Sequence, residues 1–134
     1  MIEQLNAAID AYNETVSKKA RIMAKRDEPM AQHTSFRIGG PVSLFAACPT
    51  AEALCTLIRF CREYAVPYIV LGNGTNVLFS DEGYEGVVIA TGAMQSILRD
   101  GNTLLCDAGV SLTAASKAAL GYALTGLEFA HGIP

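Results

Sequence analysis

Charged residues are scarce in this sequence, and tryptophan is absent. Only 17% of its 134 residues are Asp, Glu, Lys or Arg, whereas 51% are hydrophobic and the mean hydropathy is +0.28. Intrinsic disorder requires low hydrophobicity and high net charge, so this composition predicts a folded chain. A surplus of basic residues is also missing, because 10 Lys and Arg stand against 13 Asp and Glu. Binding to a phosphate backbone needs a clustered basic surface, so we exclude nucleic acid as the main partner.

Metal-binding and membrane-spanning patterns are missing as well. The four cysteines form no C-x-x-C pair and have no His at a ligand spacing, so we predict no metal site. Cys48, Cys55 and Cys61 stand in apolar surroundings and are expected to be small buried hydrophobes in a reducing compartment. No apolar run reaches the roughly 18 residues that a membrane span needs. Glu3 and Asp10 argue against a signal peptide, so we predict a cytoplasmic protein with no membrane partner.

Three nucleotide-binding and hydrolase motifs are incomplete or absent. The third glycine of a Rossmann fingerprint is replaced by Val77, and no Asp or Glu lies within residues 91–97. No Gly-Lys-Ser/Thr follows the glycines, which excludes a P-loop. The segment Gly109–Thr113 lacks the last glycine of a nucleophile elbow, so hydrolase chemistry has no support.

The first 28 residues carry a helical pattern. Apolar side chains recur mostly at three- and four-residue steps, at Ile2, Leu5, Ile9, Tyr12, Val16 and Met23. This stripe predicts one amphipathic helix over residues 1–28 that ends near Arg26, before Pro29. We expect it to dock on the body of the protein rather than to form a coiled coil.

The remainder, residues 29–134, alternates strand and helix signals. The order strand, helix, strand predicts a βαβ unit, followed by another buried strand, a hairpin and a last helix. Thr50 is the predicted cap of the first of these helices; Ser111 or Thr113 caps the last, which is expected to end at Gly126. The predicted strands are Leu44–Cys48, Tyr68–Leu71 and Gly86–Ala90, with a hairpin that turns at Asp100–Asn102.

A glycine-containing loop, Leu71–Val77, directly follows the strand at Tyr68–Leu71. Gly72 and Gly74 permit backbone conformations in which successive N–H groups face one point and bind phosphate. This short motif alone is equally typical of a plain structural turn. His33 and His131 have no evident carboxylate or serine partner in the local sequence, so we interpret both as hydrogen-bonding loop residues.

Three segments in register carry a more specific signal. They are His33–Pro41, Leu71–Asp81 and Gly126–Pro134. In order and spacing they resemble the FAD-binding domain of the UDP-N-acetylenolpyruvoylglucosamine reductases, the MurB-type enzymes of peptidoglycan precursor synthesis. The resemblance implies an α+β fold of the vanillyl-alcohol-oxidase/PCMH type, with FAD between two subdomains. It implies a truncated domain here, with a first subdomain at about residues 29–92 and the start of a second at about 93–134.

The same resemblance implies which residues contact the cofactor. The loop that holds the FAD pyrophosphate is composed of Gly72, Asn73, Gly74, Thr75, Asn76 and Val77. Gly109 belongs to a second glycine turn near the cofactor, and Gly132 and Ile133 begin a segment that approaches the flavin. The catalytic Arg, Ser and Glu of the family fall after residue 134, so we assign no catalytic residue in this chain.

The implied reaction is the reduction of the enolpyruvyl group of UDP-N-acetylglucosamine enolpyruvate to UDP-N-acetylmuramate. NADPH is the implied co-substrate, and the missing C-terminal part of the enzyme is the implied partner of this chain. The alternative is a flavin-free α/β binding or interaction module that kept the fold. A different oxidase with the same flavin fold fits the glycine loop, but the two flanking segments favour the MurB type.

Overall fold

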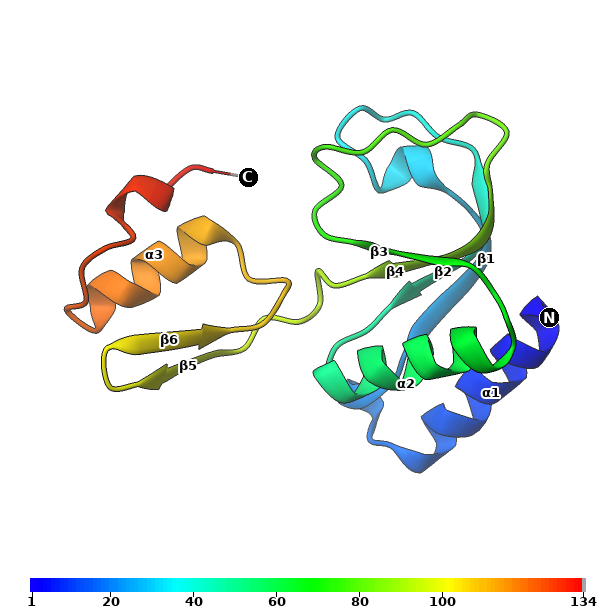
Figure 1. Ribbon diagram of the computed structural model, residues 1–134, viewed down its shortest axis with the longest axis horizontal. Helices are drawn as coiled ribbons and strands as arrows, with labels where there is room; N and C mark the ends of the chain where they lie inside the picture. Colours follow the sequence, from blue (N-terminus) through cyan, green and yellow to red (C-terminus); the bar gives the residue numbers. More distant parts are fainter. Residues whose placement is uncertain (134) are drawn as a thin grey trace.

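The computed structural model describes residues 1–133, which form two lobes (Figure 1). The large lobe, residues 1–92, holds a four-stranded sheet and two helices, and the small lobe, residues 93–133, holds a hairpin and one helix. The elements are α1 (Ile2–Thr15), β1 (Met23–Pro29), β2 (Pro41–Ala47), α2 (Ala51–Glu63), β3 (Tyr68–Leu71), β4 (Tyr84–Ala90), β5 (Ile97–Asp100), β6 (Thr103–Cys106) and α3 (Leu112–Gly121). Within this described part of the chain, no helix has the length and apolar character needed to cross a membrane.

The sheet of the large lobe has the strand order β1-β2-β4-β3. β1 pairs antiparallel with β2, whereas β2 and β3 both pair parallel with β4, which lies between them. The predicted βαβ unit is therefore confirmed as β2-α2-β3. Three parallel strands end at the same edge of the sheet, so the loops that follow β3 and β4 leave side by side.

The two faces of this sheet are covered differently. On one face, Leu44 and Val87 pack with Leu5 of α1 and Leu57 of α2, and all four side chains are fully buried. On the other face, Phe45 and its neighbours pack against loop residues rather than helices, in a smaller core of Met30, Val42, Phe45, Leu71, Phe79 and Val88. Figure 1 shows the two helices below the sheet and the loops above it.

The predicted helix over residues 1–28 is wrong in its second half. α1 ends at Thr15, and the chain reverses through a hydrogen-bonded turn in which the Asn13 side chain bonds both the N–H and the C=O of Ile22, at 2.8 and 2.9 Å. The next segment is β1, whose residues pair with the outer edge of β2. Edge pairing with a distant strand overrides the helical preference of the local sequence, and only the first part of the apolar stripe is a docked helix.

The predicted cap Thr50 is confirmed, and of the two candidates for α3 the cap is Ser111, whereas Thr113 lies inside the helix. The Thr50 and Ser111 hydroxyls each accept a hydrogen bond from a backbone N–H three residues later, at 3.1 Å. The predicted end of α3 at Gly126 is wrong, because the helix stops at Gly121. Ala123, with φ of 55°, takes the left-handed position that we had expected glycine to occupy.

The cysteines divide into buried and exposed pairs. Cys48 and Cys61 lie in the helix-side core, whereas Cys55 and Cys106 are exposed, so the predicted burial of Cys55 is wrong. Cys55 lies in α2 on the side that faces away from the core. Burial raises the pKa of the Cys48 thiol to about 12 and that of Cys61 to about 11.

This division predicts the reactivity of the thiols. Because the thiolate is the nucleophile, Cys48 and Cys61 are expected to stay unmodified by a thiol reagent in the folded chain at pH 8. Titration with Ellman's reagent should give two fast thiols in buffer and four in denaturant. Replacement of Cys55 and Cys106 with serine should remove the fast phase; a fast phase that persists in this variant would contradict the assignment.

Candidate functional site

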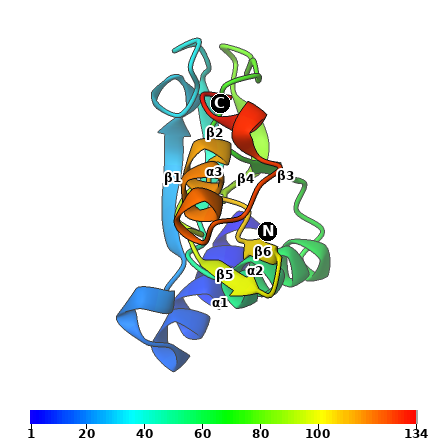
Figure 2. The ribbon, with the colours of Figure 1, turned by 90° about the vertical axis from the view of Figure 1, so that its left-hand side faces the viewer.

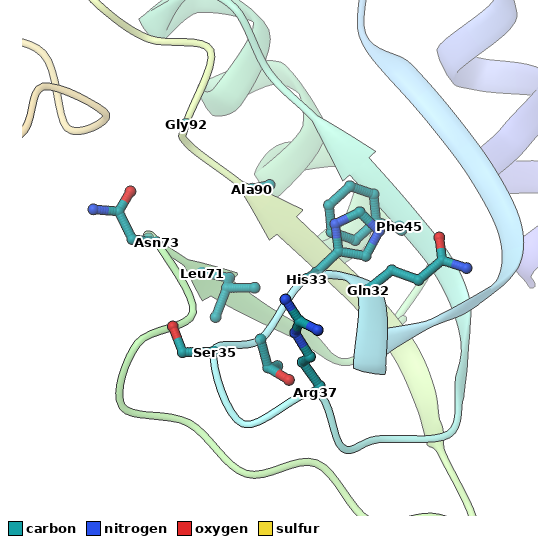
Figure 3. Close-up of a pocket in the computed structure, with 11 residues that line it drawn as sticks. Gln32, His33, Ser35, Arg37, Phe45, Leu71, Asn73, Ala90 and Gly92 are labelled. Carbon is teal, nitrogen blue, oxygen red and sulfur yellow. The ribbon is translucent and has the colours of Figure 1, made fainter. Parts of the chain in front are cut away.

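A hollow on the loop-covered face lies at the carboxyl ends of β3 and β4. It has a volume of about 550 Å3. Its walls, drawn in Figure 3, are Gln32, His33, Thr34, Ser35, Arg37, Phe45, Leu71, Gly72, Asn73, Ala90 and Gly92. Ligands of open sheets with parallel strands bind outside the carboxyl ends of the strands, so this position is typical of a binding site.

The loop of residues 72–77 borders this pocket through Gly72 and Asn73. Among residues 1–133, the backbone N–H groups of this loop donate no hydrogen bond to any other group of the protein. A Cβ atom placed on Gly72 would have no neighbour within 4 Å. A backbone N–H that is not paired within the protein must bind water or a ligand, so the amides of Gly72 and Asn73 at the pocket are suited to an anion.

Gly74 has a different role from Gly72. It is buried, with φ of +67°, and a Cβ atom there would lie 2.1 Å from the carbonyl oxygen of His33. The Ser35 N–H donates a hydrogen bond to the Gly74 carbonyl at 2.9 Å. The two loops therefore meet backbone to backbone at Gly74, and residues 33–35 support the loop that carries the free amides.

The His33 ring contacts one carboxylate and one aromatic ring. Its Nε2 lies 2.9 Å from Oε1 of Glu28, and its ring stacks on Phe45 with the centroids 3.9 Å apart. The hydrogen bond from His33 holds the pKa of the Glu28 carboxyl below its usual value, with a further contribution from Lys25 at 3.2 Å. Figure 3 shows the Arg37 side chain directed into the pocket beside His33. Arg37 brings a positive charge to a pocket whose lining contains no carboxylate.

The sequence predicts the glycine loop but not the wall that residues 32–37 contribute to the pocket. His33 was interpreted as a hydrogen-bonding loop residue, which is confirmed, but its carboxylate partner was not found. Glu28 is only five residues away in the chain. It was assigned to the end of a helix, whereas in the structure it lies in β1 and reaches the loop after that strand.

Gly74, Thr75, Asn76 and Val77 do not line this pocket; they border a second hollow of about 310 Å3 on the same loop. The remaining predicted cofactor residues, Gly109, Gly132 and Ile133, lie in the small lobe and line neither hollow. Gly109 donates its N–H to the Met94 carbonyl at 3.0 Å, and the Gln95 amide links the carbonyls of Gly92 and Gly109 at 2.7 Å each. The Gly132 N–H bonds the Thr113 hydroxyl at 2.9 Å. Ile133 follows it. Both views in Figure 1 and Figure 2 place the segment after α3 on the side of the molecule that carries the large lobe's loops.

Comparison with known proteins identifies the family. Residues 42–134 match the family model described as FAD binding domain. The UDP-N-acetylenolpyruvoylglucosamine reductase of Caldanaerobacter subterraneus is 42% identical over 108 residues, which cover 81% of this chain and 36% of that protein. The reductase of Clostridium botulinum is 46% identical over 105 residues, covering 78% and 34%. The chain therefore spans about a third of the length of these curated relatives.

A solved structure shows the same fold. The crystal structure of p-cresol methylhydroxylase with substrate bound matches 91% of this chain and 25% of its own, with a TM-score of 0.62 and 15% identity. The α+β fold of the vanillyl-alcohol-oxidase/PCMH type, implied by the three sequence segments, is thereby confirmed, as is the resemblance to the reductases. The chain belongs to the FAD binding domain family, and FAD is the cofactor of this domain.

Proposed function

We propose that this chain is the FAD-binding part of an NADPH-dependent UDP-N-acetylenolpyruvoylglucosamine reductase of peptidoglycan precursor synthesis. The observation that carries the proposal is the 42–46% identity, over about four fifths of the chain, to proteins with this name. The chain spans only about a third of those proteins. We therefore assign the catalytic side chains to the rest of the enzyme and expect this chain to be inactive alone. For the enzyme we propose a cytoplasmic location.

The loop 72–77 and the pocket that it borders fit the pyrophosphate of FAD. The free amides of residues 72–77 supply the donors, Gly72 leaves room for close approach of the phosphates, and Arg37 supplies positive charge. When bound, FAD supplies the redox chemistry that no side chain can perform. The residues of this chain bind and orient the cofactor; in our proposal Gly109, Gly132 and Ile133 complete its site from the small lobe.

A single methyl group at Gly72 tests this assignment. In a protein with the full length of the relatives, we expect Gly72→Ala to weaken FAD binding about tenfold or more, because the added Cβ enters the space where the phosphates approach. The stability of the apoprotein should stay within about 0.5 kcal/mol, since nothing surrounds that Cβ. FAD binding is measured by quenching of flavin fluorescence and stability by urea unfolding.

The matched control is Gly121→Ala, which also adds a methyl group where nothing lies within 4 Å, but in the last turn of α3 and outside the lining of the pocket. It should leave the affinity within about threefold of the parent's. A folded full-length protein that takes up no FAD would instead favour the flavin-free binding module. Equal FAD affinity in the parent and in Gly72→Ala would refute the pyrophosphate assignment.

A further inference from the structure

Glu28 and His33 form a connection between the sheet and the loop 72–77. Glu28 lies in β1 and His33 in the loop that follows it, and the Oε1–Nε2 distance is 2.9 Å. Both side chains are largely shielded from solvent, with 12% and 25% of their surfaces exposed. A hydrogen bond to a charged group that is shielded in this way is stronger than one on the open surface.

The His33 ring has a second anchor in the sheet. It stacks on the Phe45 ring of β2 (Figure 3). The interplanar angle of the two rings is 19°. A stacking contact fixes the plane of the imidazole, and the bond to Glu28 fixes its rotation within that plane. Two neighbouring strands therefore determine where His33, and with it the backbone of residues 33–35, is placed.

The backbone of residues 33–35 in turn contacts the loop 72–77. The Ser35 N–H donates to the Gly74 carbonyl at 2.9 Å, and the His33 carbonyl occupies the space where a Gly74 side chain would be. Because this contact leaves no gap, a displacement of residues 33–35 displaces Gly74 and the amides on both sides of it.

From this chain of contacts we infer that Glu28 and His33 are positioning residues for FAD: they hold the amides of residues 72–77 in the arrangement that binds the pyrophosphate. The inference rests on the proposed function, but neither residue needs to touch the cofactor. Preorganised donors bind an anion without a reordering cost, so loss of the connection should appear as weaker FAD binding.

Four variants test the hydrogen bond between Glu28 and His33 separately from the neighbouring contacts. Glu28→Ala removes it, and Glu28→Gln keeps an oxygen that can accept from His33. His33→Phe keeps a ring on Phe45 but loses the hydrogen bond, and it serves as the second test if Glu28→Ala fails to fold. Lys25→Ala is the matched control, because it removes the exposed partner of the same carboxylate at 3.2 Å and leaves His33 untouched.

The first measurement uses the 134-residue chain without cofactor. We expect Glu28→Ala and His33→Phe to speed hydrogen exchange of the Ser35 amide about tenfold, whereas Glu28→Gln and Lys25→Ala stay within about threefold of the parent. The second measurement is the dissociation constant of FAD in the full-length protein. It should rise about tenfold in the first two variants and recover in Glu28→Gln.

Each result is decisive. Unchanged Ser35 exchange in both Glu28→Ala and His33→Phe overturns the inference, whatever the cofactor does. Faster exchange with unchanged FAD affinity also overturns it, because the pair then stabilises a loop without positioning the phosphate donors. A parent protein that takes up no FAD overturns the proposed function, and the exchange rates, measured without cofactor, still decide whether the pair holds the loop.

Discussion

Replacing Gly74 with alanine is expected to destabilise the chain by about 3 kcal/mol, from two separate causes. The first is conformational, because a φ of +67° costs an L-residue about 1–2 kcal/mol. The second is steric: the new Cβ would lie 2.1 Å from the His33 carbonyl oxygen and 3.3 Å from the Thr34 Cα, both of which are backbone atoms. No rotation of a side chain relieves such a contact, so the two loops must separate.

Urea unfolding followed by circular dichroism measures this loss. Gly72→Ala is the matched control, because it adds the same methyl group two residues away, where nothing lies within 4 Å and φ is not left-handed. Gly74→Ala should lower the free energy of unfolding, whereas Gly72→Ala should leave it unchanged and weaken FAD binding. Equal stability of the two variants would show that the contact between the loops at Gly74 is not what holds them together.

Two elements with strong local signals are confirmed by the structure. The strand at Tyr68–Leu71 is a short run of apolar and β-branched residues, and the helix after Thr50 has both a cap and an apolar face. The end of the first helix could not be predicted, because nothing near Met23 in the sequence shows that β2 offers an unpaired edge to β1. A strand that depends on a partner about 20 residues away has no local signature.

In the candidate site, too, the features with a local sequence signal could be predicted and those that depend on distant pairing could not. The loop after β3 is predicted, since glycines after an apolar strand are a local pattern. The predicted burial of that strand is wrong, because β3 lies at the edge of the sheet and Ile69 and Val70 are exposed. The pairing of Glu28 with His33 was missed because it depends on β1, and an error in the fold there removed the carboxylate from consideration. Likewise, local sequence could not distinguish Gly74, which is needed for the contact between loops, from Gly72, which borders open space.

Gly109→Ala is the second substitution with a large expected effect, and it acts at the junction of the two lobes. A Cβ atom there would lie 2.1 Å from the Thr91 carbonyl oxygen and 2.5 Å from that of Met94. The backbone of Gly109 is itself bonded to Met94 at 3.0 Å, and Gln95 ties it to Gly92. The methyl group must therefore push the turn at 107–110 away from the exit of β4, at a cost of about 3 kcal/mol.

A control in the same lobe should move stability the other way. Gly121→Ala lies in the last turn of α3 with nothing within 4 Å of its Cβ, so it should stabilise the helix by about 0.5–1 kcal/mol. Hydrogen exchange of the backbone amide at position 109 should accelerate in Gly109→Ala and stay unchanged in Gly121→Ala. Because Gly92 lines the pocket, FAD binding by the full-length protein should weaken with Gly109→Ala alone. If the exchange and the affinity both stay at the parent's values, Gly109 is not the point at which the small lobe is fastened to the cofactor site.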